Sequence, residues 1–128
     1  MIVLGIDTAT AATAVAVRAD GAPLGERRDD PAAGAHPGHA TRLLAMAHEL
    51  LDETGIPWSA LDRVAVGVGP GGFTGLRVGV ATARGIAHAL ALELVGVSSL
   101  RALALAAARI DHREQRVAAR CSPRRMRA

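Results

Sequence analysis

Apolar residues recur along the chain with two different periods, which predict alternating strands and helices. Short runs of aliphatic residues are typical of strands, whereas leucine and alanine at intervals of three and four residues are typical of helices. The first pattern predicts five strands, at residues 1–6, 13–18, 23–28, 63–68 and 94–97. The second pattern predicts three helices, at residues 39–53, 73–91 and about 98–109.

The connections between these elements predict how they are arranged. Asp20-Gly21 is typical of the tight turn of a hairpin, so the second and third strands should pair antiparallel. Each later strand follows a helix, and a right-handed helical crossover makes such strands parallel. The order β-β-β-α-β-α-β-α therefore predicts an α/β fold, with a mixed five-stranded sheet and helices packed on it.

Charge is distributed unevenly along the chain. All 15 basic residues are arginines, and the formal net charge is +3. Seven of these arginines lie in residues 109–128, so the rest of the chain is mildly acidic. Neither hydrophobic period continues beyond Arg109, and we expect disorder there. An arginine-rich segment can bind nucleic acid, but no aromatic residue for base stacking lies between these arginines, which favours a solvated tail.

The cysteine content and the apolar runs indicate the compartment. Cys121 is the single cysteine and cannot form an internal disulfide, which suits a reducing cytoplasm. The N-terminus lacks the pattern of a signal peptide. The longest apolar stretch, residues 78–95, is interrupted by charged residues and is not typical of a membrane span. We therefore expect a cytoplasmic protein that makes no membrane contact.

The most distinctive segment is the glycine-rich block at residues 67–79, which joins the fourth strand to the second helix. A glycine-rich turn before a helix can present backbone N–H groups to an anion. The spacing of Gly67 and Gly72 matches a P-loop, but Phe73 stands where the phosphate-binding lysine should be. The same glycines match a dinucleotide fingerprint, without an acidic residue at the end of the next strand. The block predicts at most a degenerate phosphate-type loop, formed by Asp7, Gly69, Gly71, Gly72 and Thr74.

The same glycines also have a purely structural interpretation. Glycine permits positive φ angles and a close approach between helix and sheet. Thr74 would then cap the second helix. Within that helix, small residues recur every four positions and form a ridge that another helix could approach closely, either within this chain or from a partner. The ridge consists of Gly75, Gly79, Ala83, Ala87 and Ala91.

The sequence gives only weak evidence for a metal site or for catalytic residues elsewhere in the chain. His36 and His39 have the spacing of metal ligands but lack a third ligand, so we expect no metal. Asp7, at the end of the first strand, could hold Mg²⁺ but is more typical of a turn. The sequence indicates no catalytic triad or cysteine nucleophile, and we expect no cofactor.

Three segments together resemble the TsaB family of tRNA threonylcarbamoyladenosine biosynthesis proteins, which is related to the actin-like ATPases. They are residues 6–10, residues 69–79 and residues 96–100, and the resemblance extends from residue 1 to about residue 108. It implies that residues 1–110 form a ribonuclease-H-like subdomain of the ASKHA superfamily. Gly72 stands where the family usually has serine.

The resemblance also implies a function and partners. A TsaB-type chain is a non-catalytic subunit that pairs with the transferase TsaD and works with the ATPase TsaE. The complex modifies the adenosine beside the anticodon of tRNAs that read A-starting codons, so tRNA would be met only through the complex. The same surface can form homodimers. The two helices of the partner surface correspond here to His39, Leu43, Met46, Leu50, Gly75, Leu76, Gly79, Val80 and Ala83.

Two further expectations follow from the resemblance. The second subdomain of the family would begin near residue 111, where the arginine-rich residues 111–128 stand instead. We therefore expect these residues to be the product of a truncation or a frameshift, with the second subdomain missing. The alternative function is an independent nucleotide-binding ATPase of the actin-like superfamily, suggested by Asp7 and the glycine turn.

Overall fold

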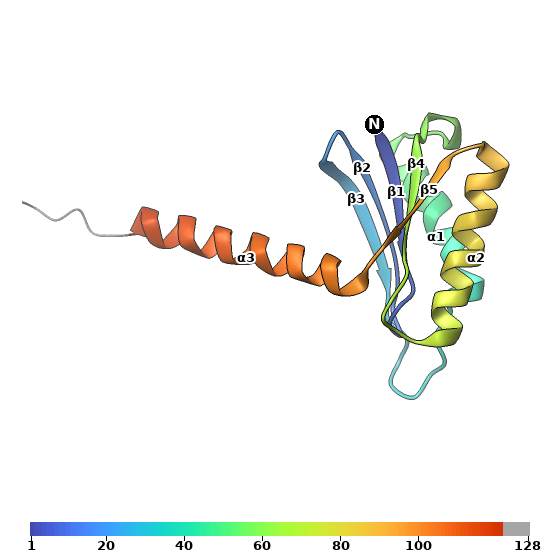
Figure 1. Cartoon of the computed structure of the whole chain (residues 1–128), viewed down its shortest axis with the longest axis horizontal. Coiled ribbons are helices and arrows are strands. Elements are labelled where there is room, and N and C mark those ends of the chain that lie inside the picture. The colour runs from blue at the N-terminus through green and yellow to red at the C-terminus, as the bar shows by residue number, and fades with distance from the viewer. Residues whose placement is uncertain (122–128) are drawn as a thin grey trace, which may run out of the picture.

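The computed structural model describes residues 1–121, with the surroundings of the side chains described through residue 111. Its elements follow the predicted order (Figure 1). They are β1 (Ile2–Asp7), β2 (Thr13–Ala19), β3 (Ala22–Asp29), α1 (His39–Thr54), the short 3₁₀ helix η1 (Trp58–Ala60), β4 (Arg63–Gly67), α2 (Phe73–Leu90), β5 (Glu93–Val97) and α3 (Ser99–Cys121).

The five strands form one mixed sheet in the order β3-β2-β1-β4-β5. The three strands β1, β2 and β3 pair antiparallel, while β4 and β5 run parallel to β1. Ile6 of β1 lies between Val15 of β2 and Val66 of β4. The parallel pairing brings the carboxyl ends of β1 and β4 to the same edge of the sheet. The predicted α/β class and mixed sheet are confirmed.

The core lies between one face of the sheet and the helices α1 and α2 (Figure 1). Side chains alternate between the two faces of a strand, so every second strand residue points toward these helices. The buried apolar residues of the sheet are Leu4, Ile6, Val15, Val17, Val64 and Val66. They pack against Leu43, Met46, Ala47, Leu50, Leu51, Ala83, Ile86 and Ala87 of the two helices.

Helix α3 departs from the prediction. It does not end near Arg109 but continues to Cys121, so the disorder expected after Arg109 is wrong for residues 110–121. Residues 99–121 contain neither glycine nor proline and are rich in alanine and arginine, which favour helix. The domain boundary expected near residue 110 falls within this helix. The rest of the predicted disordered tail, residues 122–128, lies outside the described residues.

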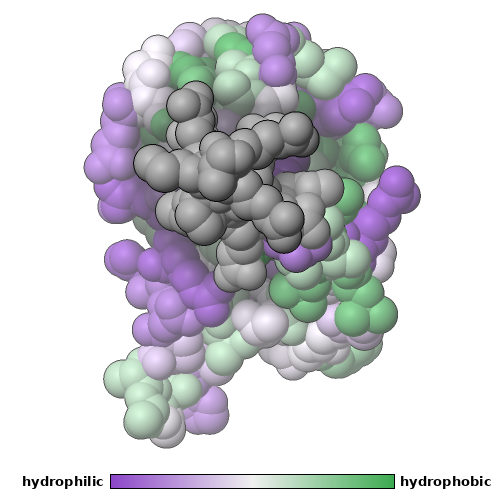
Figure 2. Space-filling view, turned by 90° about the vertical axis from the view of Figure 1, so that its left-hand side faces the viewer, coloured by the Kyte–Doolittle hydropathy of each residue, from purple (hydrophilic) through white to green (hydrophobic). Residues whose placement is uncertain are grey.

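Helix α3 also projects away from the sheet instead of packing on it (Figure 1). Residues 100–111 are all exposed. Seen from the side to which α3 points, the surface carries both hydrophilic and hydrophobic patches (Figure 2). Part of the apolar surface of the described chain is therefore not used by its own fold.

Candidate functional sites at the glycine-rich turn and the helix pair

The glycine-rich turn lies at the sheet edge where β1 and β4 both end. It packs against the turn that joins β1 to β2, and the N–H of Gly72 donates a hydrogen bond of 2.9 Å to the carbonyl of Ala9. A Cβ at Gly71 would overlap that same carbonyl. The glycines therefore serve a close approach between two turns, which supports the structural interpretation of the block.

Asp7 and Gly69 of the predicted phosphate-type loop are also engaged within the chain. One carboxylate oxygen of Asp7 accepts the N–H of Ala9 at 2.9 Å, as in a turn-forming aspartate. A Cβ at Gly67 would come within 2.7 Å of that oxygen. The carbonyl of Gly69, which has a φ of +95°, accepts the N–H of Ser99 at 2.9 Å. The structure thus brings Asp7 and the glycines together, but it does so around internal hydrogen bonds.

The predicted cap of α2 is wrong. The N-cap residue is Gly72, and it makes no side-chain capping bond. Thr74 lies inside the first turn of the helix, after the position from which a side chain can cap it, and its side chain is exposed.

The small-residue ridge of α2 packs inside the chain. Gly75, Gly79 and Ala83 are buried. A Cβ at Gly75 would overlap the carbonyl of Thr8 and come within 3.0 Å of the His39 ring, and a Cβ at Gly79 would overlap the Thr8 hydroxyl. At Gly75 and Gly79 the ridge is therefore packed against the β1–β2 turn and the start of α1, within this chain.

The α1 residues expected at the partner surface are also in the interior. Leu43, Met46 and Leu50 are almost fully buried in the core. His39 is buried as well, and its Nδ1 shares a hydrogen bond of 2.8 Å with the hydroxyl of Thr13. The sheet has taken the most apolar face of each helix, so a partner could meet only the residues beside that face. Of the nine predicted contact residues, Leu76 and Val80 alone are partly accessible.

A groove of about 620 Å³ runs along the outer surface between α1 and α2. Its lining is almost entirely apolar and consists of Leu44, His48, Trp58, Thr82, Gly85, Ile86, Ala89 and Leu90. Leu44 is 55% exposed within it. A Cβ at Gly85 would meet nothing within 4 Å, so the wall of α2 is open at that point. The predicted contact residues include no member of this groove, although Leu44 directly follows Leu43.

Two aromatic rings shape one end of the groove. The rings of His48 and Trp58 are stacked, with centroids 6.4 Å apart and planes 9° apart. The indole N–H of Trp58 donates to Nδ1 of His48 at 3.3 Å. This bond and the stacking orient the two rings relative to one another at the edge of the groove.

A second exposed feature lies on the other flank of α2. Phe73 is 74% exposed, and the guanidinium of Arg77 lies 5.2 Å from the centre of its ring. Beside them Leu76, Val80 and Arg84 border a shallow hollow. Aromatic and arginine side chains are enriched at protein interfaces, which makes this patch a second candidate contact.

Within residues 1–121, no group of three histidine, cysteine, aspartate or glutamate side chains is placed to hold a metal ion. In the same part of the chain no helix is long and apolar enough to cross a membrane.

Comparison with known proteins decides the family. The family model described as "TsaD: tRNA N6-adenosine threonylcarbamoyltransferase" matches residues 32–125. The chain belongs to this family. Its TsaB resemblance is confirmed by tRNA threonylcarbamoyladenosine biosynthesis protein TsaB of Escherichia coli K12, which is 36% identical over 104 residues, 81% of this chain and 43% of that protein. The TsaB of Haemophilus influenzae is 36% identical over 93% of this chain and 48% of its own length.

A solved structure of the family supports the fold. YeaZ from Pseudomonas aeruginosa is 40% identical and superposes with a TM-score of 0.75, covering 84% of this chain and 48% of that chain. The actin-like, ribonuclease-H-like fold class is thereby confirmed. The chain spans about half the length of the curated relatives it matches.

Proposed function

We propose that this chain is an accessory subunit in the synthesis of threonylcarbamoyladenosine in tRNA, and that it acts by binding a TsaD-type transferase in the cytoplasm. The names of its relatives support the pathway. In this proposal the chain contributes a surface and no chemical step, and it meets tRNA only through the complex. A TsaE-type ATPase would join the same assembly, and a homodimer would use the same surface.

The groove between α1 and α2 is the observation that carries this proposal. Amphipathic helices bind by laying an apolar face into such a groove, and two helices side by side can accept the ridges of another. Leu44 and Ala89 supply apolar contact area, while Gly85 leaves room for a helix backbone to come close. The groove thus fits a helical partner better than a small polar ligand.

The alternative of an independent ATPase has less support. A nucleotide phosphate at the start of α2 would need free N–H groups there. The N–H of Gly72 is bonded to Ala9, and the position of the P-loop lysine is held by the exposed Phe73. These contacts favour a scaffold role for the turn.

Co-purification with the TsaD-type protein of the same organism, followed by size-exclusion chromatography, tests the proposal. We expect a 1:1 complex with the unmodified chain, and loss of that complex with Leu44→Asp. The matched control is Leu24→Asp, which changes an exposed leucine of β3 outside the groove and should leave the complex intact.

Two results would contradict the proposal. One is a folded chain that forms no complex with the transferase, and the other is a complex that Leu44→Asp leaves unchanged. Calorimetric titration with ATP addresses the alternative, because micromolar binding with turnover would favour the ATPase.

A further inference from the structure

One side of α2 carries a row of side chains that the proposed function does not use. This row, here called the α2 stripe, consists of Phe73, Arg77, Arg84 and His88, and all four are exposed. At about 100° per residue the four positions fall within about 60° of one another around the helix axis. From Phe73 to His88 the stripe extends about 22 Å at 1.5 Å per residue. None of its members lines the α1–α2 groove, so the stripe is a separate surface.

The positive charge of this stripe is not neutralised by the described part of the chain. Helix α2 contains no aspartate or glutamate. Two hollows of about 360 and 780 Å³ lie along the stripe and share Arg84, and neither is lined by an acidic side chain. Within residues 1–111, Arg77 and Arg84 therefore have no carboxylate partner.

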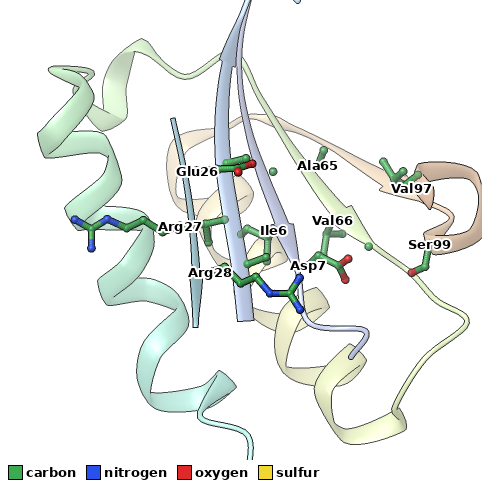
Figure 3. Close-up of a pocket in the computed structure, with 15 residues that line it drawn as sticks. Ile6, Asp7, Glu26, Arg27, Arg28, Ala65, Val66, Val97 and Ser99 are labelled. Carbon is green, nitrogen blue, oxygen red and sulfur yellow. The ribbon is translucent and has the colours of Figure 1, made fainter. Parts of the chain in front are cut away.

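Most arginines of the sheet and of α1 differ in this respect, because a carboxylate lies beside them. The ion pairs are Arg27 with Glu49 and Glu53, Arg28 with Asp30, Arg42 with Asp29, and Arg63 with Glu93. Arg28 also points toward Asp7 on the open face of the sheet (Figure 3). The cations of the α2 stripe are thus left available for an anionic partner.

Phe73 adds a second kind of contact at one end of the stripe. The guanidinium of Arg77 lies over its ring, 5.2 Å from the ring centre, and the rest of the ring is open to solvent. An exposed aromatic ring offers a face on which a base can stack, and cations beside it can hold the neighbouring phosphates. An acidic protein segment would neutralise the arginines but has no flat base for the ring. The combination therefore favours an RNA strand, in which charged phosphates and flat bases alternate.

We propose that the α2 stripe contacts an RNA strand of the substrate tRNA, with Arg77 and Arg84 at phosphates and Phe73 stacked on an unpaired base. This inference rests on the proposed function, which brings the chain to tRNA within the complex. Two phosphate contacts and one ring bind weakly by themselves, so the transferase would supply affinity by holding the RNA close to the stripe. The α1–α2 groove and the stripe share no residue, so both can be occupied at once.

Fluorescence anisotropy with a labelled, unmodified tRNA transcript tests the contact, first with the chain alone at low salt and then with its complex. The arginine-rich residues 109–128 add a background that every variant shares. Arg84→Gln should reduce the slope of log K against log salt by about 0.7–0.9, which corresponds to one lost phosphate contact. Arg84→Lys keeps the charge and should keep the slope. Phe73→Leu should lower the affinity roughly fivefold or more at every salt concentration without changing the slope.

A matched control separates a local contact from a general effect of charge. Arg42→Gln removes an exposed arginine of α1 that pairs with Asp29 at 3.8 Å, outside the stripe. It changes the net charge as much as Arg84→Gln does, but it should leave the slope unchanged. Co-purification then distinguishes this proposal from the transferase contact. Leu44→Asp should abolish the complex with the transferase, whereas Arg84→Gln should leave that complex intact.

Three results would overturn the proposal. The first is no measurable RNA binding by the chain or by its complex. The second is RNA binding that Arg84→Gln and Phe73→Leu change no more than Arg42→Gln does. The third is loss of the transferase complex with Arg84→Gln at unchanged RNA affinity, since the stripe would then be a protein contact. RNA binding through the stripe by a chain that forms no complex would support this contact and contradict the transferase proposal alone.

Discussion

The hydroxyl of Thr8 donates a hydrogen bond of 2.6 Å to the backbone carbonyl of Gly75, across 67 residues of sequence. Thr8 is fully buried; its carbonyl lies in the space left by Gly75, and its side chain lies in the space left by Gly79 on the inner side of α2. This contact joins the end of β1 to the first turns of the helix that follows the glycine-rich block. It explains why that block needs residues without side chains.

Removing the Thr8 hydroxyl should destabilise the fold. Thr8→Val keeps the volume but leaves the buried Gly75 carbonyl without this donor, which costs on the order of 1–3 kcal/mol. The free energy of unfolding from urea titration measures the loss. Thr74→Val is the control, because Thr74 is exposed and its replacement should change stability by less than about 0.5 kcal/mol. Equal stability of the two variants would contradict this role of Thr8.

Replacing two glycines of α2 by alanine should change the stability of the fold in opposite directions. Gly79→Ala would force a methyl group against Thr8 and should cost roughly 1–3 kcal/mol through overpacking. Gly85→Ala meets open space and should add about 0.5–1 kcal/mol, because alanine favours helix. Thermal unfolding of the two variants compares them directly. A gain in stability from Gly79→Ala would show that the ridge is not packed as described.

Replacing two neighbouring leucines of α1 should affect stability differently, because one lies in the core and the other at the surface. Leu43 is 1% exposed and Leu44 is 55% exposed. Leu43→Ala should cost about 2–5 kcal/mol by creating a cavity. Leu44→Ala should change stability by roughly 0.5 kcal/mol or less, and its effect should appear instead in binding of the transferase. Chemical denaturation and co-purification of both variants provide the two measurements, and a large stability loss from Leu44→Ala would contradict the assignment.

An exposed ion pair at the end of β3 should lower the pKa of one carboxyl group. The guanidinium of Arg28 donates to both carboxylate oxygens of Asp30, at 2.8 to 3.1 Å, and these hydrogen bonds hold the pKa of Asp30 below its ordinary value. Arg28→Gln should therefore raise the pKa of Asp30, which NMR titration of its carboxyl group can follow. Asp52→Asn, far from this pair, should leave the titration of Asp30 unchanged.

The sign of the accompanying stability change follows from that lowered pKa. A carboxyl group whose pKa is lower in the folded chain stabilises the fold above its unfolded pKa, and this contribution is lost as the pH falls through the folded value. Because both side chains of the pair are exposed, solvent screens the effect and it should be small. A pKa of Asp30 that Arg28→Gln leaves unchanged would contradict the pairing.

The sequence by itself determined the elements and their class. Every strand begins and ends within one residue of its prediction, and so do both ends of α1 and α2. The reason is that hydrophobic period, glycine and proline act locally, so they can be read without knowing the contacts. Three segments, the glycine block among them, likewise indicated the family, and the curated TsaB relatives confirm it.

Only the tertiary structure decided which surfaces those elements bury. Leu43 and Leu44 are the same type of residue in the same helix, but a rotation of about 100° per residue sends one into the core and the other into the groove. The small residues of α2 predicted a close approach, and the sheet register decided that Thr8 and His39 make it. Residues 100–111 of α3 are exposed and not packed into the core, so helix propensity has more weight in its extent than it has in α1 or α2. Burial depends on residues distant in sequence, and their placement is a property of the folded chain.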